Sequence, residues 1–173
     1  MIPTPIANVP AKYGFNPTQW DSLPWKERRL LILAYECDVR QVKEEPKGSN
    51  RGKDVEKYLN SVGLDGGFAW CAAFVNWGTL MAGNSERPKS PSMAASWLKF
   101  KPKSLLTIQR GDLGGWINKD GTGHVFPITK VVRKFGIPVE VHTLEGNSND
   151  EGSREGFEVC RRIRSVKGLR FAA

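Results

Sequence analysis

The sequence contains few cysteines and no long apolar run. Its three cysteines, Cys37, Cys71 and Cys160, form no CxxC spacing. This argues against a disulfide framework and against a structural zinc site, which needs about four clustered ligands. The apolar runs are far shorter than the roughly 20 residues that cross a bilayer, and no basic-then-apolar signal segment opens the chain. We therefore expect reduced thiols in a protein made in a cytoplasm without a signal peptide, with no stable membrane insertion.

Acidic residues are also in short supply. The 173 residues include 18 acidic and 26 basic side chains, so the formal net charge is +8 and the pI is about 9.6. This excess favours an anionic partner, such as nucleic acid, a phosphate-bearing cell wall or a membrane. A basic nucleic-acid-binding protein is one alternative, but zinc-finger spacing, an RNP-like run and a P-loop signature are all missing. The expected partner is therefore not nucleic acid.

The densest basic cluster is Arg161-Arg162-Ile163-Arg164, followed by Lys167 and Arg170. Two interpretations fit this cluster. It could bind anionic wall polymers, or it could be the solvated edge of a sheet, where charge prevents pairing with another strand.

The order of predicted elements indicates an α+β fold. Residues 1–23 are rich in proline and lack periodicity, which predicts an extended N-terminal arm before a single domain at 24–173. Hydrophobic periodicity predicts helices at 24–37, 53–62, 70–81 and 92–100, then strands at 111–117, 124–133, 139–145 and 157–164. Helices followed by strands favour N-terminal helices packed on a C-terminal antiparallel sheet.

Cys71 stands where a glycine-rich turn, Gly66-Gly67, runs into one of the predicted helices. A thiol at a helix N-terminus is favoured as a thiolate, the nucleophilic form, by unpaired backbone N–H groups and the helix dipole. The alternative is a small buried packing residue, and the segment taken alone favours that interpretation.

The two histidines differ in their surroundings. His124 follows a glycine turn and opens a predicted strand, where it can reach a cleft and act as a general base near neutral pH. His142 lies in the middle of a strand, on the same face as Glu140, which favours a structural role. Glu145 and Asn147 end that strand, and either could accept the ring N–H of His124. The alternative for Asn147 is a capping role in a turn.

Four short motifs in this order resemble the CHAP family of cysteine- and histidine-dependent amidohydrolases and peptidases. They are Trp70-Cys71-Ala72-Ala73-Phe74-Val75, Arg110-Gly111-Asp112-Leu113, Gly123-His124-Val125 and Glu145-Gly146-Asn147. The resemblance covers roughly residues 30–164. The sequence departs from the usual pattern at Gly114-Gly115-Trp116 and at Phe126-Pro127, and Pro127 predicts a strand edge or bulge beside the site.

The resemblance implies a papain-like fold in which Cys71 is the nucleophile and His124 the general base and later acid. Glu145 would be the third catalytic residue, with Asn147 as its supporting amide. The family cleaves amide bonds of peptidoglycan, between sugar and peptide stem or within the peptides. A thiolate and an imidazole need no metal for this chemistry, and no Asp/Asn-rich calcium loop is present, so we expect no cofactor. A phage lysin or a secreted antibacterial effector would fit, acting on the wall after release or injection. A catalytically inactive CHAP-like binding or virion module is the alternative.

Aromatic residues beside the motifs are candidate substrate contacts. Trp70 precedes the predicted nucleophile, and Trp116 lies on the glycine-rich strand. Both are assigned here as substrate-binding residues, with Trp116 the stronger candidate. The alternative is core packing, since large aromatic side chains dominate protein cores.

Overall fold

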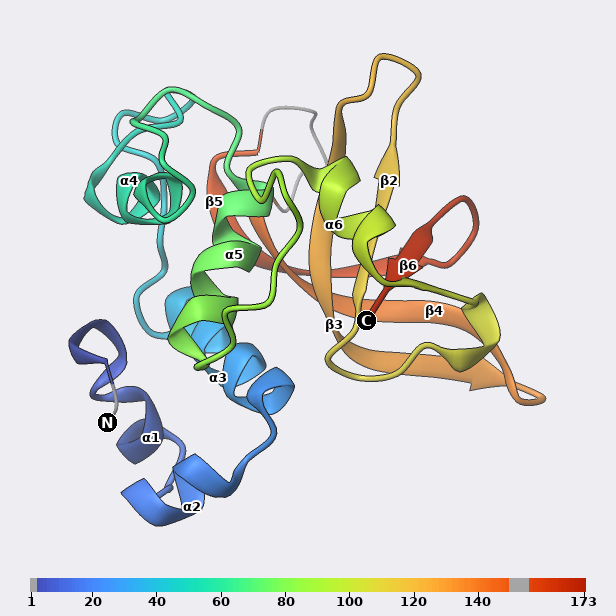
Figure 1. Ribbon diagram of the computed structural model, residues 1–173, viewed down its shortest axis with the longest axis horizontal. Coiled ribbons are helices and arrows are strands. Elements are labelled where there is room, and N and C mark those ends of the chain that lie inside the picture. The colour runs from blue at the N-terminus through green and yellow to red at the C-terminus, as the bar shows by residue number, and fades with distance from the viewer. Residues whose placement is uncertain (1–2, 150–155) are drawn as a thin grey trace.

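A six-stranded antiparallel sheet forms one side of the molecule, and helices α3, α4 and α5 lie on the other (Figure 1). The computed structural model describes residues 3–149 and 156–173. The α-helices are α1 Val9–Lys12, α2 Pro17–Ser22, α3 Trp25–Asp38, α4 Lys53–Asn60, α5 Cys71–Met81 and α6 Ala94–Phe100. The strands are β1 Pro102–Lys103, β2 Leu113–Ile117, β3 Gly123–Lys134, β4 Ile137–Ser148, β5 Glu158–Ser165 and β6 Arg170–Ala172. The predicted α+β class is confirmed.

The strands are ordered β1-β6-β2-β3-β4-β5, so β3 is internal and β5 is an edge strand. The short strands β1 and β6, which pair with each other, were not predicted. At Pro127, β3 pairs with Leu113 of β2, and its pairing with β4 begins only at Ile128, followed by a register shift. Pro127 has no backbone N–H, and at its position β3 does not yet pair with β4, so no ladder hydrogen bond is lost. Of the two predicted alternatives, an irregularity of the bulge type is found just after Pro127, between Ile128 and Lys130, whereas β3 is not an edge strand.

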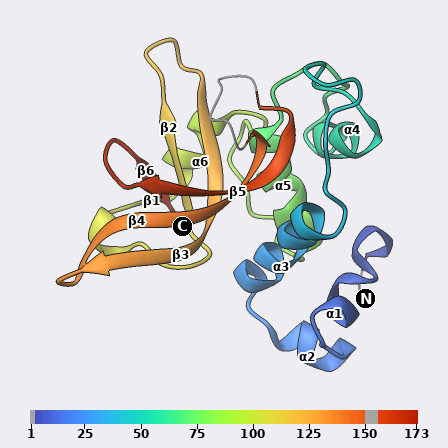
Figure 2. The same ribbon diagram turned by 180° about the vertical axis from the view of Figure 1, so that it is seen from behind.

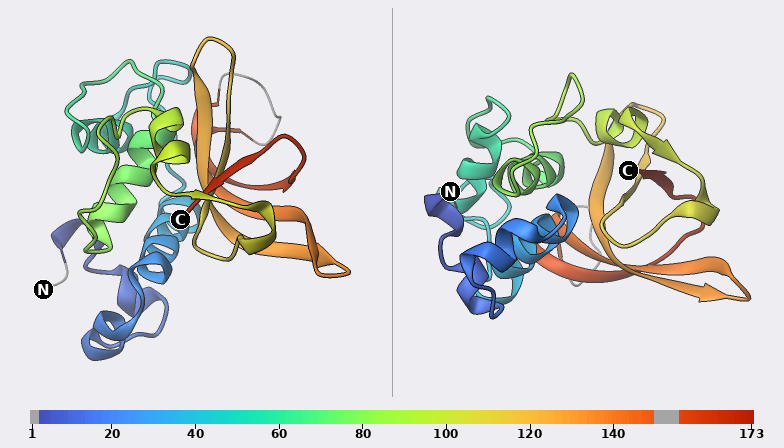
Figure 3. Two further views of the ribbon diagram at one scale, coloured as in Figure 1. Left: turned by 45° about the vertical axis from the view of Figure 1, so that its right-hand side comes forward. Right: turned by 60° about the horizontal axis from the view of Figure 1, so that its bottom comes forward.

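The N-terminal segment is helical, which corrects the predicted extended arm. It contains the short helices α1 and α2 (Figure 3, blue). The side chains of Ile6, Val9 and Trp20 are buried in the core. The prolines stand in the first turns of these helices, where the missing N–H is not needed. Asn16 and Gln19 form a reciprocal capping box at the start of α2.

Helix α5 is the central helix of the fold. Every residue from 71 to 79 is buried, because α3 and α4 pack on one side of α5 and strands β3 and β4 on another. Seen from behind, β4 and β5 run beside α3 and α5 (Figure 2). No helix among the described residues has the length and apolar character needed to span a membrane. The first residue of α5 is Cys71, so this packing fixes the position of the thiol.

The Arg110-Gly111-Asp112-Leu113 motif ties the helices to the sheet. Asp112 is fully buried and accepts hydrogen bonds from Lys26 of α3 at 2.7 Å and from Lys103 of β1 at 2.6 Å. The buried Arg29 of α3 donates to the Gly111 carbonyl at 2.6 Å. A buried carboxylate is tolerated when its charge is compensated in this way. The motif is therefore structural in this protein.

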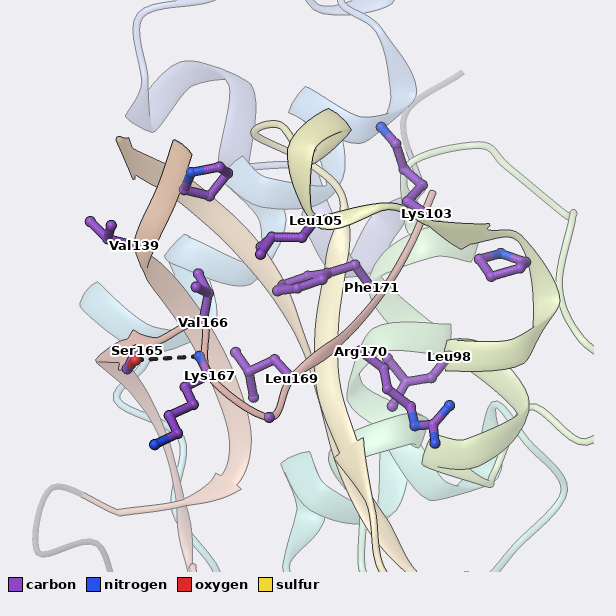
Figure 4. A pocket seen from close by; sticks show the side chains of 13 residues that line it. Leu98, Lys103, Leu105, Val139, Ser165, Val166, Lys167, Leu169, Arg170 and Phe171 are labelled. Atoms are coloured by element: carbon purple, nitrogen blue, oxygen red, sulfur yellow. Dashed lines mark hydrogen bonds between the residues drawn. The ribbon is translucent and has the colours of Figure 1, made fainter. Parts of the chain in front are cut away.

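A groove of about 680 Å³ lies where β4, β6 and the chain between α6 and β2 meet. Figure 4 shows Leu105, Val166, Leu169 and Phe171 gathered in this groove, while Lys167 points away from it. The groove shares no lining residue with the cleft that contains Cys71.

Gly114 and Gly115, which depart from the CHAP pattern, allow β2 to approach β3 closely. A Cβ added at Gly115 would lie 2.1 Å from the carbonyl oxygen of His124. A Cβ added at Gly114 would lie 2.8 Å from the ring of Phe126. The glycines therefore set the position of the strand that carries His124.

Gly115→Ala should lower the free energy of unfolding by about 1–3 kcal/mol, because the methyl group must displace the β3 backbone. Urea denaturation measures this change. Gly66→Ala is the matched control, since the nearest atoms to its methyl group belong to the flexible side chains of Arg51 and Glu56, both partly exposed, and not to a backbone. We expect the control to stay within about 0.5 kcal/mol of wild type. A Gly115→Ala protein as stable as wild type would contradict this account of the glycine pair.

Candidate active site

The N-terminus of α5 is held in place by Trp70, its N-cap residue. The Trp70 indole N–H donates to Glu44 Oε1 at 2.9 Å, and Glu44 Oε2 accepts the backbone N–H of Asn50 at 2.9 Å. Trp70 also packs against Tyr58 and Phe74, with no exposed surface. This corrects the prediction of Trp70 as a substrate contact. Its indole is a core group that anchors the helix start through a carboxylate far away in the sequence.

His124 lies next to Glu145 and Cys71. His124 Nε2 is 2.9 Å from Glu145 Oε2, and the ring also shares a hydrogen bond with the Cys71 thiol. An ionised carboxylate only accepts hydrogen bonds, so Nε2 carries a proton and Nδ1 is left for the sulfur. The question that the sequence left open is thereby answered, because Glu145 and not Asn147 contacts His124.

Glu145 is fully buried, but hydrogen bonds and a positive charge compensate its carboxylate. Arg164 of β5 forms two hydrogen bonds with it, from Nε to Oε1 at 2.5 Å and from Nη2 to Oε2 at 2.6 Å. The hydroxyls of Thr143 and Ser148 donate to it at 2.7 and 3.2 Å. Burial raises the pKa of Glu145, but the hydrogen bonds from Arg164 and His124 outweigh this and bring it to about 2. Glu145 is therefore an anion at all physiological pH values.

Cys71 and His124 stabilise each other as an ion pair. Burial opposes ionisation of the Cys71 thiol, but the charge and hydrogen bond of His124 and the backbone N–H groups of Val125 and Ala72 leave its pKa below the ordinary value. Burial likewise opposes the charging of His124, but Cys71 and then Glu145 raise the pKa of the ring to about 9. Thiolate and imidazolium thus coexist between the two pKa values.

The close approach of β4 to α5 brings Glu145 into this arrangement. A Cβ at Gly146 would lie 2.7 Å from the Trp70 ring and 2.8 Å from that of Phe74, so only glycine fits without displacing them. The β4–β5 register shifts between Glu145 and Ser148, and Asn147 has a φ of 56°. This irregularity turns the Ser148 hydroxyl back toward Glu145.

Cys71 and His124 line a cleft of about 820 Å³. Cys71 and His124 are 6% and 9% exposed, so the thiol and the imidazole lie at its inner surface. Trp116 lines the cleft opposite His124 in the β2–β3 pair, and the two ring centroids are 4.9 Å apart. Arg164 also lies over the Trp116 ring, at 5.0 Å from its centroid. Trp116 is thus placed where a substrate contact was predicted, and the contact itself stays a prediction.

Asn147 reaches the cleft wall but does not support Glu145. Its amide donates to Asn50 Oδ1 at 3.2 Å and so joins β4 to the loop before α4. The supporting groups are instead Thr143, Ser148 and Arg164. Thr143 could have been found from strand alternation, since it lies two residues before Glu145 on the same face.

The remaining predicted residues lie elsewhere or play other roles. His142 pairs with Glu140 at 3.5 Å and does not line the cleft, in agreement with its predicted structural role. Among the residues that the structure describes, no group of three or more histidine, cysteine or acidic side chains could hold a metal ion.

Iodoacetamide should modify Cys71 at pH values where an ordinary thiol, with a pKa of about 8.5, is protonated. The rate should decline only as the pH falls through the lowered pKa of Cys71. His124→Ala removes the cation and should move this decline to higher pH, whereas His142→Ala should not. Mass spectrometry of labelled peptides separates Cys71 from Cys37, whose pKa is raised to about 12 by burial and by Asp38. Identical profiles for wild type and His124→Ala would contradict the ion pair.

No family model, curated protein or solved structure matches this chain. The likeness to CHAP proteins therefore rests on the four short motifs.

Proposed function

We propose that this protein is a cysteine hydrolase of the CHAP type, with a papain-like arrangement, that cleaves an amide bond of peptidoglycan. The observation that carries the proposal is the chain of contacts from Glu145 through His124 to Cys71 at the inner surface of the cleft. A nucleophile, a base and an orienting acid in hydrogen-bond contact are what covalent amide hydrolysis requires.

In the first step, the Cys71 thiolate attacks the carbonyl carbon of the amide. A C–S bond forms, and the electron pair of the C=O double bond moves onto oxygen. The first N–H groups of a helix have no intrahelical acceptor, so those at the start of α5 are available to stabilise this oxyanion. His124 then gives its Nδ1 proton to the leaving nitrogen as the C–N bond breaks, which leaves a thioester.

In the second step, His124 takes a proton from a water molecule, which attacks the thioester carbonyl. The C–S bond breaks, and the acid product and the Cys71 sulfur are released with the imidazolium restored. Glu145 stays ionised throughout, because its pKa of about 2 lies far below that of His124. Its role is to fix the ring and to stabilise the cation.

The substrate class is supported by the four CHAP-like motifs and by the cleft lining. The cleft combines the aromatic ring of Trp116 with basic side chains, including Lys119 and Arg162. A wall peptide attached to a glycan offers apolar faces, amides and carboxylates to such a surface.

Cys71→Ala should lower the rate of release of soluble fragments from purified peptidoglycan by at least about a thousandfold, because the nucleophile is lost. Cys37→Ala is the matched control, since it removes a thiol that does not line the cleft, and it should keep the wild-type rate. Mass spectrometry of the fragments identifies the bond that is cut. An active Cys71→Ala protein, or a wild-type protein that releases no fragments from diverse walls, would overturn the proposal.

A further inference from the structure

One wall of the cleft carries more positive charge than the proposed chemistry uses. Lys119, Arg162 and Arg164 all line it. The charge of Arg164 is offset by its two hydrogen bonds to Glu145. The one acidic residue among the lining residues, Asp120, accepts hydrogen bonds from the N–H and the hydroxyl of Thr122 and so holds its own turn. Neither step of the proposed reaction uses Arg162 or Lys119.

Arg162 is held in a fixed place beside the reactive groups. It lies two residues before Arg164 on β5, so strand alternation turns both side chains to the same face. Its Nη1 donates to the Asn149 carbonyl at 2.7 Å, and its own carbonyl accepts the Thr143 hydroxyl at 3.2 Å. The side chain is half-buried.

No described carboxylate forms an ion pair with Arg162. The neighbouring arginines both have such partners, since Arg161 is 2.6 Å from Asp38 and Arg164 is 2.5 Å from Glu145. Lys119, on the exposed turn between β2 and β3, likewise has no acidic partner among the described residues. A planar guanidinium with open N–H groups is suited to bidentate binding of a carboxylate.

We infer that Arg162, assisted by Lys119, binds a free carboxylate of the substrate next to the amide that Cys71 attacks. This inference rests on the proposed function and narrows its substrate class to acidic peptides. A substrate carboxylate bound there would exchange its hydrogen bonds to water for charge-assisted hydrogen bonds to Arg162. This contact would also orient the peptide along the cleft. A substrate whose carboxylate is converted to a carboxamide would lose that interaction.

The test uses two synthetic wall-peptide substrates that differ only in a carboxylate or a carboxamide beside the cleaved bond. Wild-type protein should cleave the carboxylate substrate with a kcat/KM about 10–100-fold higher, the range expected for a hydrogen bond between charged groups. Arg162→Gln should remove most of that preference, mainly through a higher KM, and should leave cleavage of the carboxamide nearly unchanged. Lys119→Gln should reduce the preference by a smaller factor.

Arg170→Gln is the matched control, because it removes the same charge from a residue that does not line the cleft. It should keep the full preference. If Arg162→Gln still cleaves the carboxamide substrate, the variant is folded. The comparison of the two substrates with wild type, and the Lys119→Gln variant, test the same site without altering strand β5. Equal rates for the two substrates with wild type, or equal losses on both with Arg162→Gln, would overturn the carboxylate site alone. No cleavage of either substrate by wild type would overturn the proposed function.

Discussion

The compensated burial of Glu145 is the interaction on which the rest of the site depends. A carboxylate with no exposed surface is costly unless its charge is paired and its oxygens accept hydrogen bonds. Arg164, Thr143 and Ser148 supply these bonds, so Glu145 remains ionised beside His124. The anion in turn favours the imidazolium, and the imidazolium favours the Cys71 thiolate. The charges thus alternate along a row of four side chains, from Arg164 on the edge strand through Glu145 and His124 to Cys71.

The architecture around these side chains keeps them in register. Glu145 pairs with Cys160, and Arg164 lies four residues further along β5, on the same face. A shift of the β4–β5 pairing by one residue would turn Arg164 to the other face and leave Glu145 uncompensated. Gly146 lets β4 approach α5, and Gly115 lets β2 approach the strand of His124. Both glycines therefore serve the alignment of Cys71, His124 and Glu145.

Local sequence signals predicted part of this protein well. The beginnings of α5 and β3 follow from hydrophobic periodicity and glycine turns, so Cys71 and His124 were correctly assigned to element starts. The predicted strand end at Glu145 was wrong, because β4 continues to Ser148. The extended N-terminal arm was wrong, because prolines that suggest an irregular chain also suit the first turn of short helices. The capping box of Asn16 and Gln19 was the local signal for a helix there.

The errors at the site concern contacts between distant segments. Trp70 is buried because Glu44, 26 residues away, accepts its N–H, and no local pattern indicates that pairing. Arg164 was interpreted as part of a basic surface cluster, since the register that aims it at Glu145 is set by tertiary structure. Strand alternation in fact divides the cluster, because Arg161 pairs with Asp38 on one face of β5, whereas Arg162 and Arg164 line the cleft on the other face.

The central claim is that His124 is a cation paired with the Cys71 thiolate, and NMR titration of the His124 ring tests it most directly. The account predicts a pKa near 9 in the wild-type protein and a clearly lower value in Cys71→Ala, because the largest favourable influence on the imidazolium is the sulfur. A His124 ring that titrates near the ordinary value of about 6.5 in both proteins would contradict the account.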